Sequence, residues 1–254
     1  MKTRQRVTYT VLPPVLFAGV LLAAWWGATV MFEIRSFILP SPAQVASVFA
    51  EQGGYLYRST RTTLNEAAVG YGLAATIGLT AGAVLASWPP LARATLPTLV
   101  GLDAVPKLAL APLLVVWLGF GTTPKVVIVV LTCLLPVILA TVGGLTDTPA
   151  DQVELSRSLR ASWWKTLQKV RFPFALPRIF VGLKIAAPLA VIGAVIGEFF
   201  GATAGLGYAI RAAGSDTSLV YAALVLLATL SVGLFYLVVG AERLAAPWAR
   251  QASA

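Results

Sequence analysis

The sequence predicts an all-helical membrane protein, a bundle of about six transmembrane helices formed by one domain over residues 1–254. Hydrophobic residues make up 58% of the chain and charged residues only 11%, whereas soluble domains contain about 45–50% and about 25%. The apolar residues also gather into long runs, and short segments between the runs hold most of the charges. Both observations are explained if much of the protein surface faces lipid.

Six apolar segments are long enough to cross the hydrocarbon core, for which a helix needs about 20 residues. They cover residues 11–32, 64–88, 96–118, 124–145, 179–201 and 218–240. The first segment follows the basic sequence MKTRQR. Because its apolar run is longer than the roughly 7–15 residues of a signal peptide, we expect it to remain as an uncleaved span.

The segment between the first two spans has a helical pattern of its own. Val45, Val48 and Phe49 share one helical face, and Gly53 and Gly54 follow them. Two interpretations stay open for this segment. It is either an amphipathic helix at the membrane surface or an exposed loop.

The third span contains Pro106 and Pro112, six residues apart. Proline removes a backbone donor, and membrane helices tolerate it where neighbouring helices or water satisfy the freed carbonyl groups. The pair indicates either a bent or broken helix beside a solute pathway, or ordinary packing kinks.

The distribution of lysine and arginine gives the orientation, because cytoplasmic loops carry the excess of these residues. Twelve fall on the side of the N-terminus, and five fall on the other side, namely Arg35, Arg58, Arg61, Lys125 and Arg211. Both termini are therefore expected in the cytoplasm. The polar segment 147–178, between spans four and five, is expected there too.

Several classes of function are excluded by residue content. The net charge of +9 has no water-exposed domain on which to form a nucleic-acid site. Histidine is absent and Cys133 is the single cysteine, so we expect no disulfide, no metal site and no histidine acid–base catalysis. The chain also lacks a phosphate-binding loop motif. It is therefore not expected to be an enzyme, and any ATP hydrolysis would occur in another chain.

A charge inside a span costs about 2.5–3.5 kcal/mol. We therefore select Asp103, Lys107 and Glu198, which lie inside expected spans, as candidates for the solute pathway. Asp103 and Lys107 are four residues apart, so they either neutralise each other or contact the solute. Glu198 either lines the pathway or bonds to a neighbouring helix.

Glycines spaced four residues apart indicate faces on which two helices approach closely. The glycines with this spacing are Gly78, Gly82, Gly193, Gly197 and Gly201. We expect them to serve packing rather than solute binding.

The polar segment contains the sequence DQVELSRSLRASWWKTLQKVRFPFALP at 151–177. Its pattern predicts two short helices, with an apolar stripe of Trp163, Leu167 and Val170 on the second. Pro173 is expected to end that helix, and Pro177 to begin the next span. Such a helix pair either lies on anionic lipid or docks into a protein groove.

This segment resembles the cytoplasmic signature of permease subunits of binding-protein-dependent ABC importers: Glu-Ala-Ala, three residues, Gly, nine residues, Ile-x-Leu-Pro. Glu154-Leu155-Ser156, Arg160 and Val170-Arg171-Phe172-Pro173 match its spacing without a gap. Most of the remaining chain is similar to the nitrate, taurine and sulfonate permease subfamily. The similar stretches are LPSP (39–42), VPKLALAPLLVVWLGFG (105–121), ALPRIFVGLKIA (175–186), GAVIGEFFGA (193–202), GLGY (205–208) and DTSLVYAAL (216–224).

The resemblance implies a type I ABC importer permease fold in the bacterial inner membrane. It also implies a homodimer in the lipid bilayer, an extracytoplasmic solute-binding protein, and a cytoplasmic ATPase that binds ATP and magnesium. This chain would hold no cofactor and would move a solute by alternating access. The solute would be a sulfonate- or nitrate-type anion, or an aromatic heterocycle such as a thiamine pyrimidine precursor. The alternative is an ion-coupled secondary transporter, for which internal repeats and more buried ionisable groups are expected.

The resemblance further implies that segment 147–178 couples the permease to the ATPase. Glu154 would pair with a basic or polar group there, and Leu155 and Leu159 would provide apolar contact. The residues assigned to coupling are Glu154, Leu155, Ser156, Leu159, Arg160, Trp163, Leu167, Val170 and Pro173. Arg160 stands where the family has glycine, and a left-handed backbone is costly for arginine. We therefore expect either more continuous helices or a turn at another residue.

Overall fold

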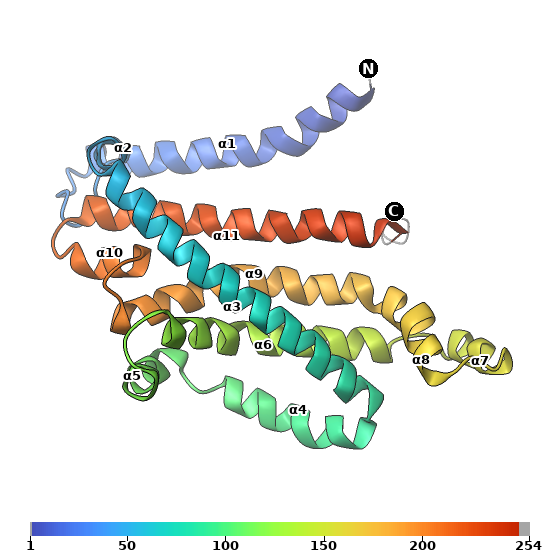
Figure 1. Cartoon of the computed structure of the whole chain (residues 1–254). Coiled ribbons are helices and arrows are strands. Elements are labelled where there is room, and N and C mark those ends of the chain that lie inside the picture. Colours follow the sequence, from blue (N-terminus) through green and yellow to red (C-terminus); the bar gives the residue numbers. More distant parts are fainter. Residues whose placement is uncertain (1, 249–254) are drawn as a thin grey trace.

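The computed structural model describes residues 2–248, with the side chains of Pro13 and residues 16–248, and this part of the chain is helical without strands (Figure 1). The all-helical prediction is confirmed. The long helices are α1 (Lys2–Met31), α3 (Gly53–Ser87), α6 (Thr122–Thr146), α9 (Phe172–Gly201) and α11 (Thr217–Ala245). The shorter ones are α2 (Pro42–Glu51), α4 (Pro89–Asp103), α5 (Lys107–Leu118), α7 (Ala150–Ser158), α8 (Trp163–Thr166) and α10 (Leu206–Ala212), and a π-helical turn, η1 (Leu167–Arg171), joins α8 to α9.

Four helical stretches are long and apolar enough to cross a membrane: α3, α6, the stretch Trp163–Gly201 and α11. The third expected span is a broken pair, α4 and α5, which meet at an angle of 91° and make a fifth span if counted together. In α1, the apolar stretch with described side chains is Leu16–Met31, which is shorter than a full span. The described residues therefore provide four or five spans, where the sequence predicted about six.

Proline chemistry explains the break between α4 and α5. Pro106 has a fixed φ of −61° with extended ψ, and it caps the N-terminus of α5 without a side-chain hydrogen bond. Its ring also disfavours a helical conformation at the preceding residue. Pro112 lies inside α5 without ending it. Of the two interpretations of the proline pair, the broken helix is correct, and the break falls at Pro106.

The centre of the bundle is formed by α6, with α9 beside it and α3 crossing it (Figure 1). Glycines face the neighbouring helices at these contacts: Gly78 and Gly82 of α3 and Gly193 and Gly197 of α9 against α6, and Gly201 of α9 against α5. A Cβ atom added at Gly78 would lie 2.7 Å from Cγ1 of Val137. The helices therefore approach until a single methyl group no longer fits between them.

The segment before α3 is a helix rather than a loop. A capping box begins α2, because Ser41 and Gln44 exchange hydrogen bonds between side chain and backbone. Val45 and Val48 are buried against Leu219 and Ala222 of α11. Of the two interpretations of this segment, the helical one is therefore correct.

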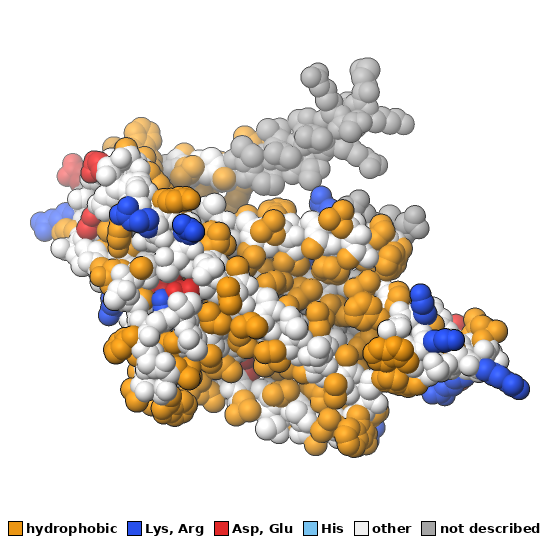
Figure 2. Space-filling model, in the orientation of Figure 1, with side chains coloured by type: hydrophobic (Ala, Val, Ile, Leu, Met, Phe, Trp, Pro, Cys, Tyr) orange, Lys and Arg blue, Asp and Glu red, His pale blue; other side chains and the backbone are white. Residues whose placement is uncertain are grey.

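Both described ends of the chain lie toward the same end of the bundle as α7 and α8, whereas α2, α5 and α10 lie toward the opposite end (Figure 1). We refer to these as the α7 end and the α10 end. Hydrophobic side chains cover much of the surface between the two ends in Figure 2. A lipid-facing band between two polar ends is typical of a membrane-spanning bundle.

The close contact at Gly78 can be tested by a pair of alanine substitutions in the same helix. Gly78→Ala is expected to destabilise the protein by about 1–3 kcal/mol, because the new methyl group overlaps Val137. Gly72→Ala is the control, since a Cβ atom there meets nothing within 4 Å. Thermal unfolding in detergent measures both variants. Equal melting temperatures for the two would contradict the close packing of α3 on α6.

Candidate solute pathway and coupling segment

The helix α7 presents an exposed face at the end of the bundle. Its side chains Leu155 and Leu159 are 62% and 75% exposed, and Glu154 is exposed beside them. Figure 2 shows basic side chains gathered over this end of the molecule. Two neighbouring exposed leucines surrounded by polar residues form an apolar patch. Such patches are typical of surfaces that contact another protein or the membrane.

The opposite face of α7 packs against the chain that follows it. Val153 and Ser156 are buried, and the Ser156 hydroxyl oxygen lies 3.2 Å from that of Thr166 in α8. Ser156, assigned to coupling from the sequence, therefore faces inward and holds α7 onto α8. The four-residue spacing of the leucines indicated the outer face, and Ser156 lies off that face.

The turn after α7 occurs at Arg160, so the expectation that it would move or disappear is wrong. Arg160 adopts a left-handed conformation with φ 53°. Its amide donates to the Arg157 carbonyl at 2.8 Å, and the Ala161 amide donates to the Ser156 carbonyl at 3.0 Å. These two bonds form a Schellman motif, which ends a helix with a left-handed residue. The hydrogen bonds hold arginine in a conformation that glycine adopts without penalty.

The second helix of this segment does not end at Pro173, and this prediction is also wrong. The stretch Trp163–Gly201 is continuous over 39 residues. In η1 the Phe172 amide donates to the Leu167 carbonyl, five residues earlier. This wider turn accommodates Pro173, whose ring would clash with the carbonyl four residues before it in a regular α-helix. Pro177 likewise lies inside α9 and begins no new helix.

Four of the remaining residues of the coupling set line a groove, and Trp163 and Leu167 lie outside it. A groove of about 470 Å³ is lined by Leu155, Leu159, Val170 and Pro173, together with Trp248 from the C-terminal segment. Trp163 is exposed, and Leu167 is half-buried against the core that contains Leu145 and Ile179. The groove therefore lies between α7, η1 and the start of α9.

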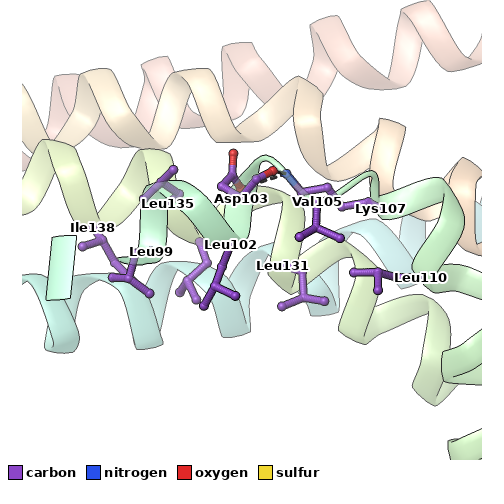
Figure 3. Close-up of a pocket in the computed structure, with 10 residues that line it drawn as sticks. Leu99, Leu102, Asp103, Val105, Lys107, Leu110, Leu131, Leu135 and Ile138 are labelled. Carbon is purple, nitrogen blue, oxygen red and sulfur yellow. Dashed lines mark hydrogen bonds and ion pairs between the residues drawn. The ribbon is translucent and has the colours of Figure 1, made fainter. Parts of the chain in front are cut away.

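The break between α4 and α5 holds a cavity. Asp103 and Lys107 face each other across the break, with Lys107 Nζ 2.9 Å from Asp103 Oδ1. The Lys107 ammonium group also donates to the Asp103 backbone carbonyl. A cavity of about 120 Å³ lies beside this pair and is otherwise lined by aliphatic side chains of α4, α5 and α6 (Figure 3). The two charges neutralise each other, but they do so across a broken helix rather than along one helical face.

A second hollow lies nearer the α7 end. It has a volume of about 400 Å³, and Asp103 and Leu135 line both spaces. Its walls are side chains of α6 and α9, and it reaches Arg178 near the start of α9. Arg178 forms an ion pair with Asp147 just beyond α6. The two hollows therefore share Asp103 and Leu135 as lining residues, and the second extends to Arg178.

Glu198 is fully buried, with 0% of its surface exposed. Its carboxylate accepts hydrogen bonds from the Thr63 hydroxyl of α3 at 2.6 Å and from the Gly207 amide of α10. A Cβ atom at Gly205, which has a φ of 114°, would overlap this carboxylate. Of the two roles considered for Glu198, the structure shows the second, because its carboxylate is hydrogen-bonded to α3 and α10.

A buried ion pair beside Glu198 was not identified from the sequence. Lys125 of α6 donates to the Glu66 carboxylate of α3, and both side chains are buried. Lys125 was counted among the loop charges on the α10 side, and Glu66 was passed over. Both lie inside the predicted spans 124–145 and 64–88, so the criterion that selected Asp103 would have selected them.

Comparison with known families identifies the chain. The family described as "Binding-protein-dependent transport system inner membrane component" matches residues 74–244. The chain belongs to this family. As a binding-protein-dependent permease it is a membrane-spanning transport subunit, and the resemblance inferred from the coupling signature is confirmed.

Similar permeases come from several bacteria. A probable ABC transporter permease of Haemophilus influenzae is 37% identical over 89% of this chain and 93% of its own length. The riboflavin transport permease RibX of Chloroflexus aurantiacus is 36% identical over 98% and 94%. The formylaminopyrimidine transport permease ThiX of Halalkalibacterium halodurans is 31% identical over 96% and 98%. These matches extend over nearly the whole permease.

The fold matches that of a solved ABC transporter. A chain of the MetNI methionine ABC transporter, in an inward-facing conformation, superposes with a TM-score of 0.68 at 21% identity. The match covers 77% of this permease and 98% of that chain. The type I ABC importer permease fold is therefore confirmed.

The buried pair Glu66–Lys125 can be tested by removing its cation. Lys125→Met is expected to destabilise the permease by about 3–5 kcal/mol, because it leaves the Glu66 charge buried without a partner. The double variant Lys125→Met, Glu66→Leu is expected to recover most of this loss. Thermal unfolding in detergent provides the comparison. A double variant as unstable as Lys125→Met alone would contradict the pairing.

A substitution at the left-handed residue Arg160 is expected to stabilise the permease, in contrast to the loss expected for Lys125→Met. Arg160→Gly is expected to stabilise the permease by about 0.5–1 kcal/mol, the left-handed penalty of about 1–2 kcal/mol less the extra chain entropy of glycine. Arg157→Gly, inside α7, is the control and is expected to destabilise by a similar amount. Thermal unfolding measures both. A fall in melting temperature for Arg160→Gly would contradict the assigned turn.

Proposed function

We propose that this permease subunit is driven by a separate ATPase that docks on α7 and moves the α7–α8 pair. The observation that carries the proposal is the exposed pair Leu155, inside α7, and Leu159, which caps the C-terminus of α7. Interfaces depend on a few apolar anchors surrounded by polar contacts. Glu154 lies next to these anchors and would contact a basic or polar group of the ATPase. ATP and magnesium would bind to that partner, not to this chain.

The α7–α8 pair is suited to transmit movement into the bundle. The two helices are joined by the Ser156–Thr166 contact and by the turn at Arg160. The second helix runs without interruption into α9 as far as Gly201. Displacement of α7 by the ATPase would therefore move a helix that reaches the opposite end of the permease.

The solute pathway in this proposal passes through the two hollows that Asp103 lines. They lead toward Arg178 and the α7 end, which would face the cytoplasm together with both termini. A solute-binding protein would deliver the solute at the α10 end, and a second copy of this chain would complete the pathway as a homodimer. Closure and opening of the ATPase would then expose the pathway to each side in turn.

The family membership supports import of a small solute and argues against an ion-coupled secondary transporter. Similar permeases are named for riboflavin, formylaminopyrimidine, aliphatic sulfonates and taurine. The solute of this permease would belong either to the heterocycles or to the small anions. The permease itself would lie in the bacterial inner membrane, cross it several times and keep both termini in the cytoplasm.

The coupling proposal is tested with the permease reconstituted together with its candidate ATPase and binding protein. Leu155→Ala combined with Leu159→Ala is expected to lower ATP-dependent uptake at least about tenfold, a loss that corresponds to about 1.4 kcal/mol of binding. Leu64→Ala is the control, because this leucine is also exposed but lies on α3 toward the α10 end. Uptake without ATP, or undiminished uptake by the α7 variant, would contradict the proposal.

A further inference from the structure

Three ionisable side chains meet inside the bundle toward the α10 end, and their charges do not balance. Glu66 of α3, Lys125 of α6 and Glu198 of α9 are 2%, 6% and 0% exposed, respectively. Lys125 donates to Glu66 Oε1, and the two carboxyl groups lie within hydrogen-bonding reach of each other. With both glutamates ionised, two carboxylates would share one ammonium group. The cluster would then carry a net negative charge, which is costly away from water.

The charged residues of the other helices packed around this cluster are engaged elsewhere. The Arg211 guanidinium of α10 donates to the Ala202 carbonyl at 3.3 Å and lies over the Tyr208 ring. Two further lysines are held in ion pairs of their own, which are Lys107–Asp103 beside α5 and Lys184–Glu242 between α9 and α11. In the described part of the chain, the positive charge that acts on both carboxyl groups is therefore that of Lys125.

The hydrogen bonds of the two carboxyl groups indicate where a proton is missing. Glu198 has two donors, the Thr63 hydroxyl at 2.6 Å and the Gly207 amide. Glu66 Oε2, in contrast, is buried and has no hydrogen-bond partner. Buried polar atoms of folded proteins are almost always paired, so this oxygen requires a donor. A protonated carboxyl group at Glu198, next to it, would provide that donor.

A polar hollow connects Glu66 with water on the α10 side. It has a volume of about 710 Å³, and Glu66 lines it together with the polar side chains of Arg58, Arg61, Asn65 and Thr122. Both arginines are exposed, and charges surrounded by water interact weakly with a buried carboxylate. They therefore do not replace a missing counter-charge. A polar space of this size admits water, which supplies a route for a proton to reach Glu66.

We propose that Glu66 and Glu198 form a proton-binding site, in which the two carboxyl groups hold one proton between them while Glu66 stays paired with Lys125. Glu198 donates this proton to Glu66 Oε2, so the last unpaired oxygen of the cluster gains a donor. The cluster then contains one carboxylate and one ammonium group and is electrically neutral. The site requires neither solute nor ATPase, so it is independent of the function proposed above.

The bound proton also contributes to the attachment of α10. The Leu206 amide donates to the Thr63 hydroxyl at 2.8 Å, and the Gly207 amide donates to Glu198. Helix α10 is therefore held at the point where α3 and α9 meet. Loss of the proton would place two carboxylates side by side, and their repulsion would act to separate α3 from α9 at this point.

Infrared spectroscopy of the full-length permease, in a detergent without carbonyl groups, tests the proposal. The C=O stretch of a protonated carboxyl group is separate from the bands of a carboxylate, and labelling glutamate with carbon-13 assigns it to this residue type. The other glutamates of the chain are exposed or paired with a lysine, and they are Glu33, Glu51, Glu154 and Glu242. At neutral pH such groups are ionised. We therefore expect a labelled acid band equivalent to one glutamate per chain, and a spectrum without this band would overturn the proposal.

Two single substitutions distinguish a shared proton from an ordinary buried acid. Glu66→Gln and Glu198→Gln are each expected to abolish the acid band, because each leaves a single carboxylate beside Lys125. The control is Glu242→Gln, which removes the carboxylate that lies 2.9 Å from Lys184 Nζ and is expected to leave the band unchanged. A band that persists in Glu66→Gln or in Glu198→Gln would overturn the shared site. The wild-type spectrum decides by itself whether a protonated glutamate is present, so the test does not depend on the stability of the variants.

Discussion

The close approach of α3 and α9 to α6 is the constraint on which the rest of this permease depends. Helices in lipid gain little from hydrophobic association, so packing and hydrogen bonds must hold them together. Glycines at the contacts bring the backbones near enough for Val137 and Val129 to fill the space of a missing side chain. At that separation the carboxylates of Glu66 and Glu198 each reach a partner on another helix, Lys125 and Thr63, respectively.

The two ends of the permease are connected through one continuous helix. Near its start the turn of η1 accommodates Pro173, and close to its other end Glu198 fixes α10 through the Gly207 amide. Its 39 residues correspond to a length of roughly 58 Å at about 1.5 Å per residue. The broken pair α4–α5 lies beside this rigid element. The structure thus combines one long stiff helix with one span that is interrupted where the cavity lies.

The sequence was sufficient for the features that depend on local pattern. Apolar runs predicted most of the spans, Pro106 predicted the broken helix, and the signature from Glu154 to Pro173 predicted the family. It failed where a local hydrogen-bond pattern overrides a residue preference. Arg160 takes the left-handed position of a complete Schellman motif, and a π-helical turn accommodates Pro173 inside a continuous helix. Lys125 and Glu66 were missed for another reason: the in-span criterion was not applied to residues at the edges of the spans, and their pairing across 59 residues is visible only in the fold.

That separation has a consequence for biogenesis. Glu66 enters the membrane with α3, and Lys125 is synthesised 59 residues later, which at about 5–20 residues per second takes roughly 3–12 s. During this interval α3 carries a carboxylate without its cation. Release of α3 alone into lipid would leave this group without its cation, which is costly in hydrocarbon. The buried ion pair therefore favours joint insertion of α3 and α6.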